Sequence, residues 1–411
     1  MFAFNYTQNK TIDIGEDKML EKAVTNQIKK VLREAIDKDE LAGGNLLLIK
    51  DGKELFYHED GLADIQNDIP IRRDTIFRLY SMSKPITAAA VMILFERGEI
   101  DLYDPVSKYL PGFKGQSVEE EGKLVPVERE VNLKDLLSMT SGLVYGGPNK
   151  AGQDTEALFR EIDSRLLGGS PMSTLEAMNK LGGCALAFQP GTSWQYGTSA
   201  DVLGAVVEAV SNKCFGQFLK DELFTPLNMN DTDFWVPSEK RHRLAKVYAA
   251  KGEKGLVDYT GCHLGVINSM DRKPEFESGG AGLASTIDDY SKFAKMLMNN
   301  GSLEDMKILK PRTVQYLTSG CLSAAQQQSF EQWLTLEGHS YRNLMRIMTD
   351  CSKAGILGSA GEYGWDGWLG AYFCNCPKDN LTLLFMMQKT DSGTTTIARK
   401  LRNIILSAYC E

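Results

Sequence analysis

The chain has 411 residues, of which 43% are hydrophobic, and its 46 Lys and Arg against 54 Asp and Glu give a formal net charge of −8. A chain of this length can bury a large core, and it predicts about two domains. It carries no basic cluster, which argues against nucleic acid and anionic membranes as partners. No apolar run reaches the ~18 residues of a membrane span and no signal-like segment opens the chain, so we expect a cytoplasmic protein.

Eight cysteines are scattered along the chain, and without a secretion signal we expect free thiols. Cys374 and Cys376 are the one close pair. Their spacing, with no second pair or histidine partner, is not that of a usual structural zinc site. Alternate positions on a strand account for the pair more simply. We therefore expect no metal and no cofactor.

The N-terminal region predicts a helix followed by a hairpin. Apolar residues recur at helical spacing over 19–36, which is typical of a packed amphipathic helix. Two strands are predicted next, over 45–50 and 54–58, because Asp51 and Gly52 between them are a strong signal for a two-residue turn.

The middle of the chain is predicted to be mostly helical. Its clearest helices cover 201–210 and 215–223, where apolar residues follow helical spacing. We expect residues 101–274 to form a helical domain. This domain would be inserted between 1–100 and 275–411, which together would form an α/β domain.

The last part of the chain returns to alternating helices and strands. Ser285 or Thr286 can cap a helix, strands are predicted over 369–376 and 381–387, and a final helix over 395–409. The continuous apolar run 381–387 is typical of a central strand covered on both faces. These strands and the N-terminal hairpin would then complete one sheet.

One short motif suggests nucleophilic chemistry. Ser81 and Lys84 form the only Ser-x-x-Lys of the chain, at the start of a buried, Ala-rich helix that continues over 86–95. Residues three apart share a helix face, so the hydroxyl and the amine lie side by side. The helix start also supplies a free backbone N–H. The alternative is a solvated helix start, because the pattern alone is weak.

Two further stretches carry candidate residues. Tyr196 lies in the Gly-containing loop 190–199, directly before a predicted helix, and a packed core aromatic is the alternative explanation. The segment 361–370 is dense in glycine and enters a strand, which permits a close backbone approach to a substrate. The alternative there is a glycine bend stabilised by aromatic packing.

In this order, the three motifs resemble the serine β-lactamase and penicillin-binding-protein superfamily. The resemblance is to the class C β-lactamase-like branch, which includes family VIII carboxylesterases and D-alanyl-D-alanine carboxypeptidases. It covers about 45–388 and implies an α+β, β-lactamase/transpeptidase-like fold: an antiparallel sheet flanked by helices, with a mostly helical inserted domain. Further stretches with the family's look are 77–84, 104–111, 136–143, 226–234 and 279–290.

The resemblance also implies roles for residues. Ser81 would be the acylated nucleophile, while Lys84 and Tyr196 would share the proton transfers; which of the two is the base stays open. The backbone N–H groups of Ser81 and Trp368 would form the oxyanion hole. These roles agree with chemistry, because a serine hydroxyl needs a neighbouring base and burial lowers the pKa of a lysine.

Two departures bear on the substrate. Trp365 stands where carboxylate-binding relatives have Lys or His, and Thr198 stands where the Tyr motif usually has Asn. Loss of the cation removes a charge-assisted contact worth about 1.5–3 kcal/mol. We predict that Trp365, Gly367, Tyr145 and Thr198 contact the substrate, with Trp365 and Tyr145 as walls of an apolar acyl pocket.

The resulting hypothesis is a serine hydrolase, most specifically a carboxylesterase on small neutral esters. Alternatives are a β-lactamase or D-alanyl-D-alanine carboxypeptidase, an acyltransferase that uses the same acyl-enzyme, and an inactive family member that only binds partners. The expected partner is a small ester or lactam. An α/β-hydrolase is excluded, because the chain has no Gly-x-Ser-x-Gly and none of its four histidines lies near the C-terminus.

Overall fold

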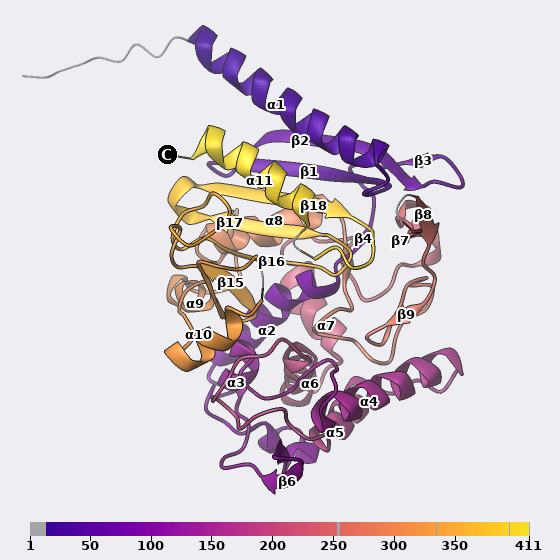
Figure 1. Cartoon of the computed structure of the whole chain (residues 1–411), viewed down its shortest axis with the longest axis vertical. Coiled ribbons are helices and arrows are strands. Elements are labelled where there is room, and N and C mark those ends of the chain that lie inside the picture. Colours follow the sequence, from indigo (N-terminus) through magenta and orange to yellow (C-terminus); the bar gives the residue numbers. More distant parts are fainter. Residues whose placement is uncertain (1–13, 253–254, 334, 394, 411) are drawn as a thin grey trace, which may run out of the picture.

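An antiparallel sheet of eight strands, in the order β14-β15-β16-β17-β18-β1-β2-β3, forms the upper half of the molecule (Figure 1). The computed structural model describes residues 14–252, 255–333, 335–393 and 395–410. The predicted antiparallel α+β architecture is confirmed. The strands are β1 (Gly43–Lys50), β2 (Lys53–Asp64), β3 (Ile69–Pro70), β14 (His339–Arg342), β15 (Met345–Met348), β16 (Tyr363–Asp366), β17 (Tyr372–Cys376) and β18 (Leu381–Met387).

The two ends of the chain meet at the centre of this sheet. β1 pairs with β18, so that Leu46 lies opposite Phe385. The predicted hairpin β1–β2 is confirmed, and its turn residues Asp51 and Gly52 have φ of 51° and 75°. Two positive φ angles are what a two-residue turn between twisted strands requires. β18 has the predicted bounds, and every residue in it is buried.

Helices cover both faces of the sheet. On one face, α1 (Ile14–Asp37) and α11 (Thr396–Tyr409) pack with their apolar stripes against β1, β17 and β18. On the other face lie α2 (Ser83–Glu96) and α8 (Ile287–Met298), inside the larger core. Coverage on both sides explains the apolar run of β18. No helix in the described part of the chain is long and apolar enough to cross a membrane.

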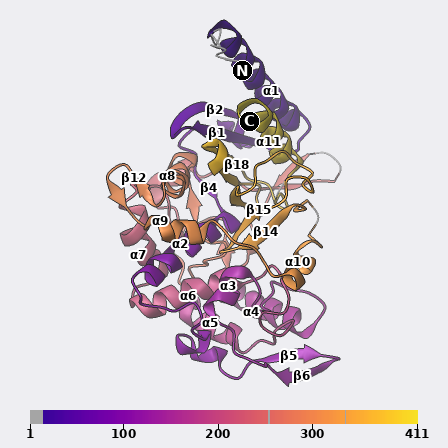
Figure 2. The same ribbon diagram turned by 90° about the vertical axis from the view of Figure 1, so that its left-hand side faces the viewer.

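The middle of the chain is helical, as predicted, and lies at the opposite end from α1 (Figures 1 and 2). Its helices are α3 (Leu133–Ser138), α4 (Lys150–Leu167), α5 (Thr174–Gly182), α6 (Ser199–Ser211) and α7 (Phe215–Leu219), which continues as a π-helical turn. The β5–β6 hairpin, which was not predicted, projects at this end (Figure 2). The domain boundaries near residues 100 and 275 stay a prediction.

Short elements complete the fold. Two of them matter for the site: β4 (Phe77–Arg78) pairs with β11 (Ala284–Ser285) and so brings the start of α2 next to the 278–283 loop. The other elements are β5 (Ser117–Glu120), β6 (Lys123–Pro126), β7 (Tyr248–Ala250), β8 (Leu256–Asp258), β9 (Cys262–His263), β10 (Val266–Ile267), β12 (Ser302–Leu303), β13 (Met306–Lys307), α9 (Pro311–Leu317) and α10 (Ala324–Phe330).

Candidate active site

Ser81 lies in a tight turn that leads into α2. The turn is a single 3-10 turn, Tyr80–Met82, and Ser81 is partly exposed within it. Tyr80 has φ of 45°, in the left-handed region that a bulky residue rarely adopts. Such a conformation costs about 1–3 kcal/mol and persists only where the surroundings hold it. Here Tyr80 is buried, and its hydroxyl donates a hydrogen bond to Asn268 Oδ1 at 3.1 Å.

Lys84 is fully buried, and its amine is held in three directions. Nζ donates hydrogen bonds to Ser81 Oγ at 3.0 Å, to Tyr145 OH at 2.9 Å and to the Gly280 carbonyl at 2.9 Å. Burial lowers the pKa of Lys84 to about 7, although the negative charges of Asp201 and Asp366 oppose the change. Near neutral pH a large fraction of Lys84 is therefore uncharged, with a lone pair that can take a proton from Ser81.

Two tyrosines flank the Lys84 amine. Nζ lies 4.7 Å from the ring centroid of Tyr196 and 5.4 Å from that of Tyr145. Burial raises the pKa of Tyr196 well above its usual value, although hydrogen bonding with Ser81 and Trp365 lowers it in part. The pKa of Tyr145 is also raised by burial. Both phenols thus keep their protons near neutral pH, which leaves Lys84 as the group able to act as the base.

Asp201 is a buried acid behind Lys84 that the sequence reasoning missed. It lies in the first turn of α6, five residues after Tyr196. One carboxylate oxygen accepts hydrogen bonds from Ser278 Oγ at 2.5 Å and from the Gly280 N–H at 3.0 Å. Asp201 therefore fixes the peptide whose carbonyl accepts from Lys84. A charged residue within the apolar run 199–207 was the signal that could have found it.

The glycine-rich third motif packs directly against the nucleophile turn. A Cβ on Gly367 would lie 2.2 Å from the Leu79 carbonyl oxygen, so only glycine allows this approach. The Trp368 ring stacks on His263 at 4.0 Å, and its Nε1 donates to Asp391 at 2.9 Å. Among the described residues, the Trp368 backbone N–H donates to no other backbone group. That leaves it available as an oxyanion donor.

Two predicted substrate contacts are almost fully buried. Trp365 is 2% exposed, and its Nε1 donates to Tyr196 OH at 3.0 Å. Thr198 is 0% exposed, and its Oγ1 has no partner among the described residues. Trp365 therefore holds Tyr196 in place and has little surface for a substrate, and both substrate roles stay predictions. A more exposed aromatic is Trp333, at 36%, whose ring centroid lies 5.0 Å from that of Tyr196.

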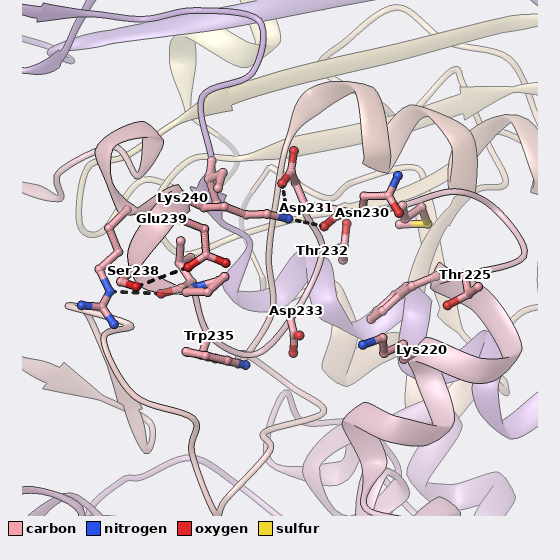
Figure 3. A pocket seen from close by; sticks show the side chains of 16 residues that line it. Lys220, Thr225, Asn230, Asp231, Thr232, Asp233, Trp235, Ser238, Glu239 and Lys240 are labelled. Atoms are coloured by element: carbon pink, nitrogen blue, oxygen red, sulfur yellow. Dashed lines mark hydrogen bonds and ion pairs between the residues drawn. The ribbon is translucent and has the colours of Figure 1, made fainter.

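A cavity of about 630 Å³ lies elsewhere, between the π-helical turn after α7 and the 229–241 loop (Figure 3). Lys240 bridges Asn230 and Asp231 on one wall, and Lys220 and Trp235 line another part. None of the predicted site residues lines this cavity. It is therefore separate from the Ser81 site.

Comparison with known proteins places this geometry in a family. The family model described as Beta-lactamase matches residues 28–406. The chain belongs to the β-lactamase family. It is 30% identical over 370 residues to Protein Rv1367c of Mycobacterium tuberculosis, covering 87% of this chain and 88% of that protein. It is also 28% identical over 353 residues to Esterase EstB of Burkholderia gladioli, covering 83% and 84%.

Solved structures support the same fold. EstCE1, titled a hydrolase with promiscuous acyltransferase activity, aligns with a TM-score of 0.80 at 23% identity, over 94% of this chain and 99% of that chain. Simvastatin synthase (LovD) from Aspergillus terreus aligns with a TM-score of 0.78 at 19% identity, over 94% and 99%. The β-lactamase/transpeptidase-like fold is thus confirmed, and the chain falls within a superfamily of serine hydrolases.

The geometry separates the roles of the two tyrosines. We expect Tyr196→Phe to lower kcat by about 10²–10⁴-fold, as loss of a placed proton donor does. Tyr145→Phe should lower kcat less. It should instead move the acid limb of the pH profile to lower pH, because the charged Lys84 loses a hydrogen-bond acceptor. The measurement is kcat and kcat/KM for a chromogenic ester between pH 5 and 9. Wild-type turnover in Tyr196→Phe together with a large loss in Tyr145→Phe would exchange the two roles.

Proposed function

We propose that the protein is a carboxylesterase that cleaves small neutral esters through an acyl-enzyme on Ser81. The observation that carries the proposal is the 3.0 Å hydrogen bond between Lys84 Nζ and Ser81 Oγ, made by a buried amine with a pKa of about 7. A base with a pKa near the working pH is the one best suited to activate a serine. The esterase name of EstB, a relative along most of the chain, is in keeping with this activity.

In the first half of the reaction, uncharged Lys84 takes the proton of Ser81 while Oγ attacks the ester carbonyl carbon. The carbonyl oxygen becomes an oxyanion, which the backbone N–H groups of Ser81 and Trp368 stabilise. Each such donor contributes about 3–4 kcal/mol. When the tetrahedral intermediate collapses, the C–O bond to the alcohol breaks. The alcohol leaves with a proton that comes from Lys84 through the Tyr196 hydroxyl.

In the second half, water replaces the alcohol. Lys84 and Tyr196 take a proton from the water as its oxygen attacks the acyl carbon, and the same two N–H groups stabilise the second oxyanion. Collapse breaks the bond to Ser81 Oγ, which regains its proton as the carboxylic acid leaves. The enzyme then returns to its starting protonation state.

Preference for a neutral substrate follows from the charges near the site. Trp365 brings no cation to the third motif. Behind it, the Arg346 guanidinium lies 5.9 Å from the Trp365 ring centroid, is 3% exposed, and pairs with Asp366 at 3.3 Å. Neither residue offers a free positive charge to a substrate carboxylate. A penicillin or a peptide with a C-terminal carboxylate would therefore lack the contact that anchors it.

Transfer of the acyl group to an alcohol is a second candidate, because the same acyl-enzyme serves water and alcohols alike. The exposed face of Trp333 beside Tyr196 favours it, since an aromatic surface suits an apolar alcohol better than water. EstCE1 and LovD carry acyl-transfer names, but their likeness to this chain is one of fold. The buried and positioned Lys84 argues against a protein that only binds partners.

Covalent labelling tests the nucleophile. A fluorophosphonate should add one adduct to the intact protein, and peptide mapping should place it on Ser81. Ser81→Ala should take up no label. Ser83→Ala, which changes the nearest other serine, should be labelled like the wild type because Ser83 Oγ only accepts from the Leu283 N–H. A label on any serine other than Ser81 would contradict the mechanism.

Side-by-side kinetics test the substrate class. p-Nitrophenyl acetate and butyrate should be turned over well, because the oxyanion hole consists of backbone groups. Benzylpenicillin and a D-alanyl-D-alanine peptide should have a kcat/KM lower by at least about tenfold, the loss expected for one charge-assisted contact. Adding a series of alcohols to the ester assay measures acyl transfer as the ratio of new ester to acid. Penicillin turnover equal to that of the esters would show that the charge argument fails.

A further inference from the structure

Two thiols and a carboxylate come together on the sheet face that α11 covers, away from Ser81. Cys374 and Cys376 are alternate residues of β17 and point to the same side, with their sulfurs 3.5 Å apart. Glu362 directly precedes β16, and its Oε2 lies 3.5 Å from Cys376 Sγ. All three side chains are 0–2% exposed. Their ligand atoms lie within 4.8 Å of one another.

The strand register extends this cluster sideways. Tyr363 pairs with Asn375 and with Ile347, so Glu362 stands beside Cys376 on one side and Met348 on the other. Met348 in turn pairs with His339. Residues directly opposite each other share a face of the sheet. His339 is 1% exposed, and its Nε2 is buried with no partner among the described residues. The row therefore offers one imidazole that nothing in the described fold uses.

The spacing of the cluster fits a tetrahedral ion site. Zinc binds sulfur at about 2.3 Å and carboxylate oxygen at about 2.0–2.2 Å, so neighbouring ligands of one ion lie about 3.6–3.8 Å apart. The sulfur–sulfur and sulfur–oxygen distances of 3.5 Å are close to this. Only small movements would be needed for three ligands to meet one ion. Met348 and His339 lie on the side where a fourth ligand would be required.

The charges also balance. Arg402 is 1% exposed, pairs with both oxygens of Glu362, and places Nη1 3.3 Å from Cys374 Sγ. Without an ion, the two thiols are neutral and the carboxylate is paired with the guanidinium. With a divalent ion and two thiolates, three negative charges and the guanidinium leave no net charge. Binding is then an exchange of two protons for one ion, which a buried cluster tolerates.

A thin loop separates the cluster from solvent. Gly358 is partly exposed, and a Cβ placed on it would lie 2.6 Å from Arg402 Nη2, 2.9 Å from Met348 Cε and 3.0 Å from Glu362 Oε2. Glycine is thus required where the loop passes over the charged groups. An ion needs to displace only this loop to reach the thiols.

We propose that Cys374, Cys376 and Glu362 form a buried site for a thiophilic divalent ion of the zinc group. The ion would tie β17 to the residue before β16, next to the anchor of α11 at Arg402. The sequence argued against such a site because a one-residue cysteine spacing supplies only two ligands. The third is brought in by strand pairing. The proposal does not depend on the esterase function.

The test is a titration of the reduced, chelator-treated protein with Cd²⁺, followed by the ultraviolet charge-transfer absorption of cadmium thiolates. We expect one equivalent to bind with release of about two protons, one for each thiol. Cys374→Ser/Cys376→Ser should lose the band. The matched control Cys321→Ser/Cys351→Ser removes two exposed cysteines and should keep it.

X-ray absorption of the wild-type protein with one equivalent of Cd²⁺ gives a readout that does not require the variants to fold. Two sulfur ligands together with oxygen or nitrogen are expected. The proposal is overturned by a shell of oxygen and nitrogen alone, by absence of the charge-transfer band in the wild type, or by a band that persists in folded Cys374→Ser/Cys376→Ser.

Discussion

The chemistry of this protein depends on a lysine amine that is kept out of water. A fall in the pKa of Lys84 from 10.5 to about 7 corresponds to about 5 kcal/mol of lost preference for the charged form. The fold maintains this environment with α2 and α6, which pack around the amine, and with the Gly280 carbonyl, which Asp201 holds in position. Asp201 also limits the shift, because its charge favours the ammonium. The amine is thereby set near neutrality rather than being fully suppressed.

The nucleophile is held by a second constraint, which is steric. Tyr80 adopts a left-handed conformation directly before Ser81, and the third motif approaches so closely that Gly367 has no room for a side chain beside the Leu79 carbonyl. β4–β11 pairing and the buried Tyr80 hydroxyl keep this turn in place. The energy stored there is supplied by the surrounding core. The result is a hydroxyl fixed between its base and a free backbone N–H.

Local patterns predicted the elements whose signals lie within a few residues. The Asp51-Gly52 turn, the apolar run of β18 and the cap of α11 at Thr395 all match the structure. β17 begins at Tyr372, later than predicted, because the residues before it form a turn in which the Gly370 N–H donates to the Gly367 carbonyl. The β14–β15 hairpin gave no signal, since its turn contains Asn343 and Leu344 at positive φ and no glycine.

The site was predictable only where a motif carried it. Ser81 and Lys84 share a turn, and their spacing alone placed them together. The contact of Tyr145 with Lys84 spans 61 residues, so no local pattern marks it, and a pocket wall was the natural expectation. Asp201 was missed for the same reason. Strand register, which no short motif encodes, likewise brings Glu362 to the two thiols.

The most direct test of the central claim is the pKa of Lys84 itself, measured by NMR on protein labelled with ¹³C at lysine Cε. The Lys84→Arg variant assigns the resonance. The account predicts a titration midpoint near pH 7, with the amine uncharged above it, while exposed lysines titrate near their usual value of about 10.4. A Lys84 resonance that also titrates near 10.4 would contradict the account, because the amine would then be charged at neutral pH and unable to activate Ser81.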